Sequence, residues 1–367
     1  MVMKNNAGGV KMINIKKNVV VLLLVAFLLG VVGCGQVKND NKAGQEPGST
    51  AGTNKAAAAK QVVGANGRTV TVPEKIDRIA ITCQGGTAQE VTILGAGDKI
   101  VAQAPMNNFP QLLKMFPRYK DIVNPGTFDD VNIEEIIKAD PDIVLVGISS
   151  KKGNQAIEEA GFPTFTMLIG WADIDTLKNE FLQMGTLLGN EKKAKELVNY
   201  WDDKIAYINK MLAKVPEDKK MRVLYASKGL KSVSGKNVWG DSLIAVAGGV
   251  NVAADISESR EVSIEQIMTW DPDVIILQKG GNAVGELKKD TRLSDLDAIK
   301  NGRVHQVPIG AFWWDRPSPE APLGFMWLAT ILYPEHTKDI DLKKETKEFF
   351  KTFYNYDLSD EEYNSFF

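Results

Sequence analysis

The chain contains 367 residues, with 44 basic (Lys or Arg) and 46 acidic (Asp or Glu) side chains and a formal net charge of −2. A chain of this length has room for two domains of ordinary size. A net charge so near zero gives no electrostatic reason to expect a nucleic-acid partner, and we predict none.

The first 34 residues have the features of a secretory signal peptide. A basic stretch at residues 11–17 precedes an apolar run from Val19 to Val32, which is short for a membrane span but suits a signal-peptide core. The run ends in Val-Val-Gly-Cys34, which is similar to the lipobox of bacterial lipoproteins, and this resemblance implies lipid attachment to the Cys34 sulfur. The alternative is an uncleaved anchor with an incidental cysteine. Met12 is an alternative start.

Residues 35–60 are small and polar and show no apolar periodicity, which is typical of a flexible tether. The chain has only two cysteines, Cys34 and Cys83. Once Cys34 is lipidated, no intramolecular disulfide can form, which fits a protein that functions outside the cytoplasm without needing one.

An amino-terminal α/β lobe is predicted over residues 61–189. Asn66-Gly67, between two short alternating stretches, predicts a β-hairpin. Arg78–Thr82 and Lys99–Ala102 are expected to be strands on either side of a helix over Ala88–Leu94, and this order predicts a doubly wound parallel sheet. Ligands bind at the carboxyl ends of such strands. The loops there supply four candidates for ligand contact: Cys83, Asn107, Asn108 and Phe109.

One long helix and a duplicated pattern organise the rest of the chain. Asn190–Lys214 carries apolar residues at gaps of three and four, without Gly or Pro, which predicts an amphipathic connecting helix. Asn132–Gly147 and Ser263–Gln278 share a polar N-cap, an Ile-Glu-x-Ile helix, an Asp-Pro-Asp turn and an apolar run. We therefore predict two α/β lobes joined by one helix, with the second lobe and its final helices over residues 215–367.

The second lobe has its own candidate ligand loop, Gly310–Pro317. It follows the predicted strand RVHQVP and precedes a helix for which Ser318 is a good N-cap and Pro319 a good first residue. Six residues of this lobe are candidates for ligand contact: Trp313, Trp314, Arg316, Trp239, Arg260 and Lys228.

Each candidate also has a purely structural alternative. Trp313 and Trp314 are adjacent in a predicted loop, so both cannot enter the core with equal ease, and one is expected in the cleft. Arg316 could donate two hydrogen bonds to a carboxylate, catecholate or oxyanion, or could pair with Asp315 or Glu320.

The remaining candidates rest on weaker arguments. Trp239 lies between turn signals and is expected in the cleft on the same grounds as the loop tryptophans. Charged loop residues such as Arg260 and Lys228 are often simply solvated, and a lone buried thiol such as Cys83 is often inert packing.

No feature of the sequence predicts an enzyme, a cofactor or a bare-metal site. The chain has two histidines, His305 and His336, whereas bare zinc or manganese needs three or four fixed ligands. No GxSxG elbow, P-loop or GxGxxG fingerprint follows a predicted strand. The aspartates of the two Asp-Pro-Asp turns precede strands, at the wrong end of the sheet for catalysis.

Several motifs occur in one order along the mature chain: GRTVTVP, RIAIT, ADPDIVLV, WDPDVIIL, GGVNVA and GRVHQVP. Together with the lipobox they resemble the substrate-binding lipoproteins of ATP-driven (ABC) importers for iron-siderophores, haem and cobalamin, the class III periplasmic binding proteins. FWWDRPSPEA and FYNYDLSDEEY are similar to the iron-complex subgroup. The resemblance implies two α/β lobes joined by a single long helix, with the ligand in the cleft between them.

The resemblance also implies a function. We expect a monomeric, lipid-anchored protein on the extracytoplasmic face of the cell membrane that delivers a chelated metal to an ABC permease and its ATPase. The resemblance also implies that two carboxylates dock the permease, those of Glu90 and Asp241. Two alternatives remain within transport, a molybdate-type oxyanion and a nickel or cobalt complex. A ligand-sensing or adhesive surface lipoprotein is the alternative of another class.

Overall fold

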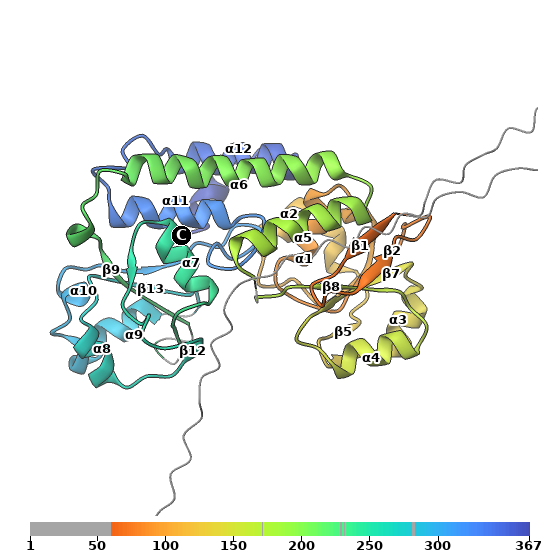
Figure 1. Cartoon of the computed structure of the whole chain (residues 1–367), viewed down its shortest axis with the longest axis horizontal. Coiled ribbons are helices and arrows are strands. Elements are labelled where there is room, and N and C mark those ends of the chain that lie inside the picture. Colours follow the sequence, from red (N-terminus) through yellow and green to blue (C-terminus); the bar gives the residue numbers. More distant parts are fainter. Residues whose placement is uncertain (1–59, 171, 228–229, 231, 281–282) are drawn as a thin grey trace, which may run out of the picture. The chain divides into compact units, whose positions relative to one another are not determined.

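The computed structural model describes residues 60–367 except 171, 228–229, 231 and 281–282 (Figure 1). The described residues belong to one compact unit, Ala57–Phe367. Four of the sequence predictions concern residues outside the described ones: the signal peptide, Cys34, nearly all of the tether, and Lys228. Within them, no helix combines the length and the apolar character needed to cross a membrane.

The first sheet is parallel, with strand order β4-β3-β7-β8, as predicted for a doubly wound lobe. Alternate residues of its strands face opposite ways, so Ile79 and Leu145 pack into one core cluster and Ala80 and Val144 into another. Helices therefore cover both faces. The strands are β3 (Ile79–Ile81), β4 (Ile100–Gln103), β7 (Ile143–Gly147) and β8 (Thr164–Met167). The helices are α1 (Thr87–Ile93), α2 (Pro110–Met115), α3 (Ile133–Ala139), α4 (Lys152–Glu159) and α5 (Ile174–Leu187).

Two hairpins accompany this sheet. β1 (Gln61–Val63) pairs with β2 (Thr69–Thr71) around Asn66-Gly67, which confirms the predicted hairpin. β5 (Gly126–Thr127) pairs with β6 (Asp130–Val131) just before α3.

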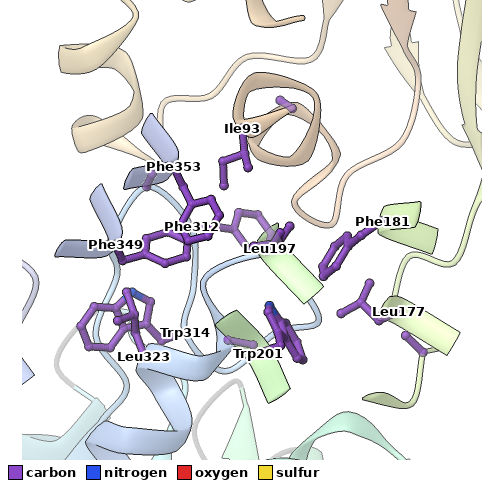
Figure 2. Packing of buried hydrophobic residues seen from close by; sticks show 14 of the residues in the cluster. Ile93, Leu177, Phe181, Leu197, Trp201, Phe312, Trp314, Leu323, Phe349 and Phe353 are labelled. Atoms are coloured by element: carbon purple, nitrogen blue, oxygen red, sulfur yellow. The ribbon is translucent and has the colours of Figure 1, made fainter. Parts of the chain in front are cut away.

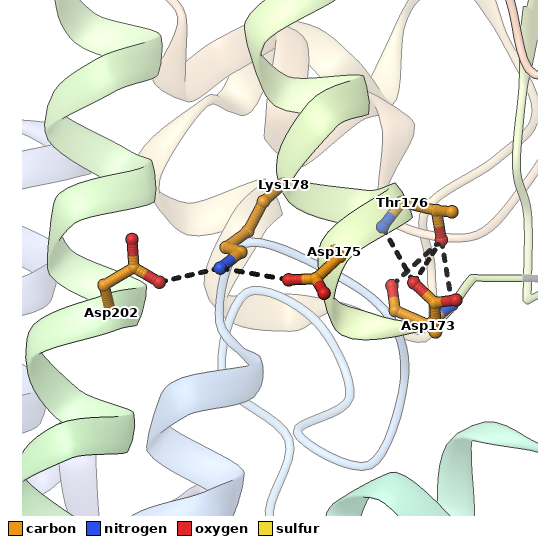
Figure 3. A network of polar contacts seen from close by, with 5 residues as sticks. All are labelled: Asp173, Asp175, Thr176, Lys178 and Asp202. Atoms are coloured by element: carbon orange, nitrogen blue, oxygen red, sulfur yellow. Dashed lines mark hydrogen bonds and ion pairs between the residues drawn. The ribbon is translucent and has the colours of Figure 1, made fainter. Parts of the chain in front are cut away.

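The predicted connecting helix is a single helix of 22 residues, α6 (Glu191–Leu212). Its buried positions, such as Leu197 and Trp201, fall on the face that the periodicity predicted. The Trp201 ring lies 5.7 Å from the ring of Phe181 on α5, and Figure 2 shows this aromatic contact within the core. Lys178 of α5 reaches Asp202 of α6 at 2.7 Å, and a capping box of Asp173 and Thr176 begins α5 (Figure 3).

The second sheet is mixed. Its order is β12-β10-β9-β13-β14, with β11 also paired to β9. β9, β11, β13 and β14 run parallel, while β10 and β12 add an antiparallel edge. The strands are β9 (Arg222–Ser227), β10 (Ser232–Ser234), β11 (Val250–Asn251), β12 (Ser259–Arg260), β13 (Val274–Leu277) and β14 (Val304–Gln306). The helices are α7 (Trp239–Val246), α8 (Ile264–Trp270), α9 (Ala283–Lys289), α10 (Asp297–Lys300), α11 (Ala321–Leu332), α12 (Leu342–Tyr354) and α13 (Asp360–Asn364).

The duplicated pattern folds the same way in both halves. The Asn132 and Ser263 side chains cap α3 and α8. The second aspartate of each Asp-Pro-Asp turn, Asp142 or Asp273, accepts hydrogen bonds from backbone N–H groups just before or at the start of the neighbouring strand. These aspartates therefore fasten each turn to the neighbouring strand.

Candidate functional site

A small pocket lies where three loops meet at the carboxyl ends of strands. Residues 83–89 follow β3, residues 104–106 and 108–109 follow β4, and Phe312 and Trp313 come from the loop after β14. The pocket has a volume of about 30 Å³, whereas sites for drug-sized ligands occupy roughly 300–1,000 Å³. None of these lining residues carries a charged side chain.

Three aromatic rings form one wall of the pocket. The Phe109 ring lies 4.9 Å from that of Phe312 and 4.7 Å from that of Trp313. Phe109 comes from the first lobe and the other two from the second, so the aromatic wall spans the predicted cleft. The Trp313 indole N–H is buried and has no hydrogen-bond acceptor among the described residues. Trp313 therefore brings an unpartnered donor to the pocket wall.

The two lobes touch closely beside this wall. Gln89 Nε2 on α1 donates a hydrogen bond to the Ala311 carbonyl at 2.8 Å. A Cβ atom on Gly86, whose φ is 91°, would lie 3.0 Å from the Ser318 Cβ. Glycine suits this position because it tolerates the positive φ and leaves room for Ser318.

Trp314 points away from the pocket, although it follows Trp313 directly. It is fully buried, and its indole N–H donates to Glu320 Oε2 at 3.1 Å. Its ring meets Phe366 edge-on at 6.1 Å. One tryptophan therefore lines the pocket and its neighbour packs in the core.

The segment after Trp314 contains a buried polar pair. Tyr225 at β9 donates its hydroxyl to Asp315 Oδ2 at 2.6 Å. Burial raises the pKa of Asp315, against the opposing influence of Arg316 and the Tyr225 hydrogen bond. Arg316 Nε lies 4.0 Å from Asp315 Oδ1, and the Arg316 side chain is 35% exposed. The ion pair that the sequence allowed is therefore long, and it leaves Arg316 partly open to solvent.

A larger groove adjoins the pocket, and Asn108 lines both. The groove has a volume of about 500 Å³ and lies between α2, the carboxyl-terminal helix α13 and the loops after β13 and β14. Two of its lining residues are cations, Lys114 and Lys279. Lys114 pairs with Glu362 at 2.6 Å, and Lys279 donates to the carbonyls of Phe366 and Phe367.

Known proteins share this architecture. Residues 81–308, more than half of the chain, match the family described as periplasmic binding protein. This chain belongs to the periplasmic binding protein family. It is 28% identical to the molybdate-binding protein MolA of Haemophilus influenzae over 314 residues, which cover 78% of this chain and 88% of MolA. It is 26% identical to the iron(3+)-hydroxamate-binding protein FhuD of Bacillus subtilis over 321 residues, which cover 83% of this chain and 94% of FhuD.

Among solved structures, a periplasmic solute binding protein from Veillonella parvula superposes with a TM-score of 0.73 at 28% identity, covering 84% of this chain and 96% of that one. The resemblance inferred from the motifs and the predicted α/β fold are thereby confirmed. The chain is an extracytoplasmic binding protein of an ABC importer, and its relatives are binding proteins rather than enzymes.

The structure places Glu90 where it cannot dock a permease. It is only 3% exposed on α1, and burial, followed by the charge of Glu180, raises its pKa well above the ordinary 4.5. The expectation of a rim carboxylate here is therefore wrong, because α1 turns this side chain into the core. Asp241 is half-buried at the start of α7 and accepts a hydrogen bond from Asn251 at 3.0 Å, so it is tied to its own lobe.

Other candidates also lie apart from the pocket. Trp239 is 4% exposed and packs its ring between those of Trp201 and Phe325, so it belongs to the core rather than the cleft. Arg260 is exposed on the edge strand β12. Asn107 is exposed, and its neighbour Asn108 lines the pocket instead.

Cys83 does line the pocket, as its place after β3 predicted. Burial raises the pKa of its thiol to about 12. The thiol therefore stays protonated at neutral pH and serves as packing rather than as a reactive group. Among the residues that the structure describes, no three His, Cys, Asp or Glu side chains gather as a metal site would require.

Three residues that matter here were not among the sequence candidates: Phe312, Gln89 and Glu320. Phe312 lies beside the candidate tryptophans, so its apolar bulk in a predicted loop was a usable signal. The sequence carried no signal for Gln89 or Glu320, because their hydrogen-bond partners Ala311 and Tyr354 come near them only in the folded chain. Ser318 is not the N-cap of α11, since the helix begins at Ala321 with Glu320 as the capping position.

Proposed function

We propose that this binding protein captures a small oxyanion of the molybdate type and delivers it to an ABC permease. The observation that carries the proposal is the unpartnered indole N–H of Trp313, a residue that lines a pocket of about 30 Å³ without charged side chains. Hydrogen bonds to an ionised acceptor are about twice as strong as neutral ones. A five-atom anion also needs far less opening of the pocket than a siderophore. The named ligand of the relative MolA supports the same class.

Titration with sodium molybdate, tungstate and sulfate, followed by calorimetry and by tryptophan fluorescence, tests the proposal. The informative variant is Trp313→Phe, which keeps the aromatic surface and removes only the N–H donor. A hydrogen bond to a charged group is worth about 1.5–3 kcal/mol, so this variant should bind molybdate at least roughly tenfold more weakly. Unchanged affinity in Trp313→Phe, or no heat of binding with any of the three anions, would contradict the oxyanion assignment.

A chelated metal is the second candidate, and two observations favour it. The rings of Phe109, Phe312 and Trp313 offer apolar surface on which a chelate could stack. The groove beyond Asn108, with about 500 Å³ and two lysines, is large enough for an organic chelator. For an iron(3+)-hydroxamate, Trp313→Phe should bind nearly as well as the parent and Trp313→Ala should not. Arg316→Ala should weaken an anionic chelate more than a neutral corrinoid or haem. A nickel or cobalt complex would follow the same rule.

Lipid anchoring through Cys34 is part of the proposal. The apolar run before Cys34 is short for a span and ends in Val-Val-Gly-Cys. Cys34→Ala should yield an unprocessed precursor or a form released from the membrane. Unchanged mobility and unchanged partitioning into detergent would exclude this anchor. In a sensing or adhesive role, the protein would bind ligand but support no ligand uptake, whether its ABC permease is present or deleted.

We propose that exposed carboxylates dock the permease, because Glu90 is buried. Glu134 and Glu265 are exposed and occupy the same position in the duplicated helices α3 and α8. Each lobe therefore presents one acidic side chain at an equivalent place. Reversing both charges should abolish uptake and leave ligand affinity intact, whereas reversal of Asp241 tests the original expectation for the second lobe. Full uptake by the Glu134→Lys, Glu265→Lys double variant would exclude this pair.

A further inference from the structure

A fully buried carboxylate lies directly beneath the loop that carries Phe312 and Trp313. Glu320 is 0% exposed. Its Oε2 accepts hydrogen bonds from the Ala311 N–H at 3.1 Å and from the Trp314 indole N–H at 3.1 Å. Ala311 and Trp314 flank the two aromatic residues of the pocket wall. The carboxylate therefore holds the loop at both ends of its tip.

The backbone of the loop is shaped around this carboxylate. The Gly310 N–H donates to the Phe312 carbonyl at 2.9 Å, and Ile309 forms an antiparallel bridge with Trp313. A Cβ atom on Gly310 would come within 2.2 Å of Glu320 Oε2 and 2.8 Å of the Trp314 Nε1. The close approach leaves no room for a side chain at residue 310, so the loop closes tightly on the carboxylate.

The other oxygen of the carboxylate is fixed from a distant part of the chain. Tyr354, the last residue of α12, donates its hydroxyl to Glu320 Oε1 at 2.8 Å. The Tyr354 ring is itself buried against Phe350 at 5.2 Å. Burial raises the pKa of Glu320 to about 7, although the donors from Tyr354, Trp314 and Ala311 act in the opposite direction. A buried acid with this many donors is costly to disturb.

We propose that Glu320 is a positioning residue whose carboxylate, anchored by Tyr354, sets the place of Phe312 and Trp313 in the ligand pocket. Glu320 does not line the pocket, so it acts on the ligand only through the loop. The consequence for ligand affinity rests on the proposed function of the pocket, whereas the placement of Trp313 does not.

The test uses fluorine NMR of the full chain labelled with 5-fluorotryptophan, without ligand. The chain has seven tryptophans, and the signal lost in Trp313→Phe assigns the resonance of Trp313. Glu320→Ala should shift or broaden this resonance and weaken binding of sodium molybdate by roughly tenfold or more. Glu320→Gln should restore most of both properties, because the amide oxygen still accepts from Ala311 and Trp314 while its NH₂ can face the Tyr354 oxygen.

Tyr354→Phe and Tyr333→Phe form a matched pair of milder variants. Each loses one buried hydroxyl, but Tyr333 bonds to Met221 and Gly248 at the amino end of β9, away from the loop. Tyr354→Phe should move the Trp313 resonance and Tyr333→Phe should leave it in place. If Glu320→Ala does not fold, this pair decides the question by itself.

A Trp313 resonance that stays at its parent position in Glu320→Ala, or that moves equally in Tyr354→Phe and Tyr333→Phe, overturns the positioning role. If the variants show the predicted resonance shifts but the parent protein binds no molybdate, the proposed ligand is overturned and the positioning role stays supported. The two failures are therefore distinguishable.

Discussion

Lys114 on α2 and Glu362 on α13 form an ion pair in which the lysine nitrogen and a carboxylate oxygen lie 2.6 Å apart. The pair ties the first lobe to the carboxyl-terminal helices. Burial raises the pKa of Glu362, but hydrogen bonds from Lys114, Tyr356 and Ser359 outweigh it and lower the pKa from 4.5 to about 2.

Because the Glu362 pKa is lower in the folded chain, its contribution to stability is fully present above pH 4.5 and is lost as the pH falls toward 2. Glu362→Gln should therefore flatten the acid limb of a plot of melting temperature against pH, measured by circular dichroism. The exposed neighbour Glu361→Gln is the control and should keep the acid limb. Identical acid limbs in the parent and in Glu362→Gln would show that the pair contributes nothing.

The buried acids of the first lobe should have the opposite pH dependence. Burial, with the charge of Glu180, raises the pKa of Glu90, and burial raises that of Glu180 to about 7. The folded state thus holds protons that the unfolded chain releases above pH 4.5, so stability falls as the pH rises from there through about 7. Glu90→Gln should raise the melting temperature at pH 8 more than at pH 5. The exposed Glu74→Gln should raise it at neither pH.

The adjacent tryptophans should respond oppositely to substitution. Trp314→Ala opens a cavity in the core and removes one hydrogen-bond donor from the buried Glu320, so it should cost about 3–5 kcal/mol in urea unfolding. Trp313→Ala, at the pocket wall, should cost much less stability and instead abolish the fluorescence response to ligand. Equal losses of stability in the two variants would contradict the assignment of one tryptophan to the core and one to the pocket.

Gly86 offers a test of the close approach between the lobes. Gly86→Ala adds a methyl group that would lie 3.0 Å from Ser318 Cβ, at a φ of 91°. We expect weaker ligand binding, because the two halves of the pocket can no longer approach as closely. Gly67→Ala is the matched control, since Gly67 also has a positive φ of 75° but would meet nothing within 4 Å. Both variants share the backbone strain of about 1–2 kcal/mol, so only the difference between them in affinity reports the contact.

Features whose physical cause is local could be predicted from the sequence. The face of α6 that carries Leu197 and Trp201 follows from residues three and four apart. The capping box of Ser359 and Glu362 at α13 is another local feature, because Ser and Glu three residues apart are its sequence signature. The duplicated helix, turn and strand were recognisable because each copy contains its own cap and turn. These local signals, in order along the chain, were sufficient for the fold and the family.

The environment of individual side chains depended on the tertiary structure. Trp313 and Trp314 are equivalent in the sequence, and only Glu320 below the loop and Phe366 beside it bring Trp314 into the core. Glu90 has the pattern of an exposed helix start, yet packing of α1 buries it. Residues far apart in the chain, such as Tyr354 and Glu320, become neighbours only when the lobes and the carboxyl-terminal helices pack together. Burial and hydrogen-bond partners are properties of that packing, so no periodicity or spacing in the sequence could specify them.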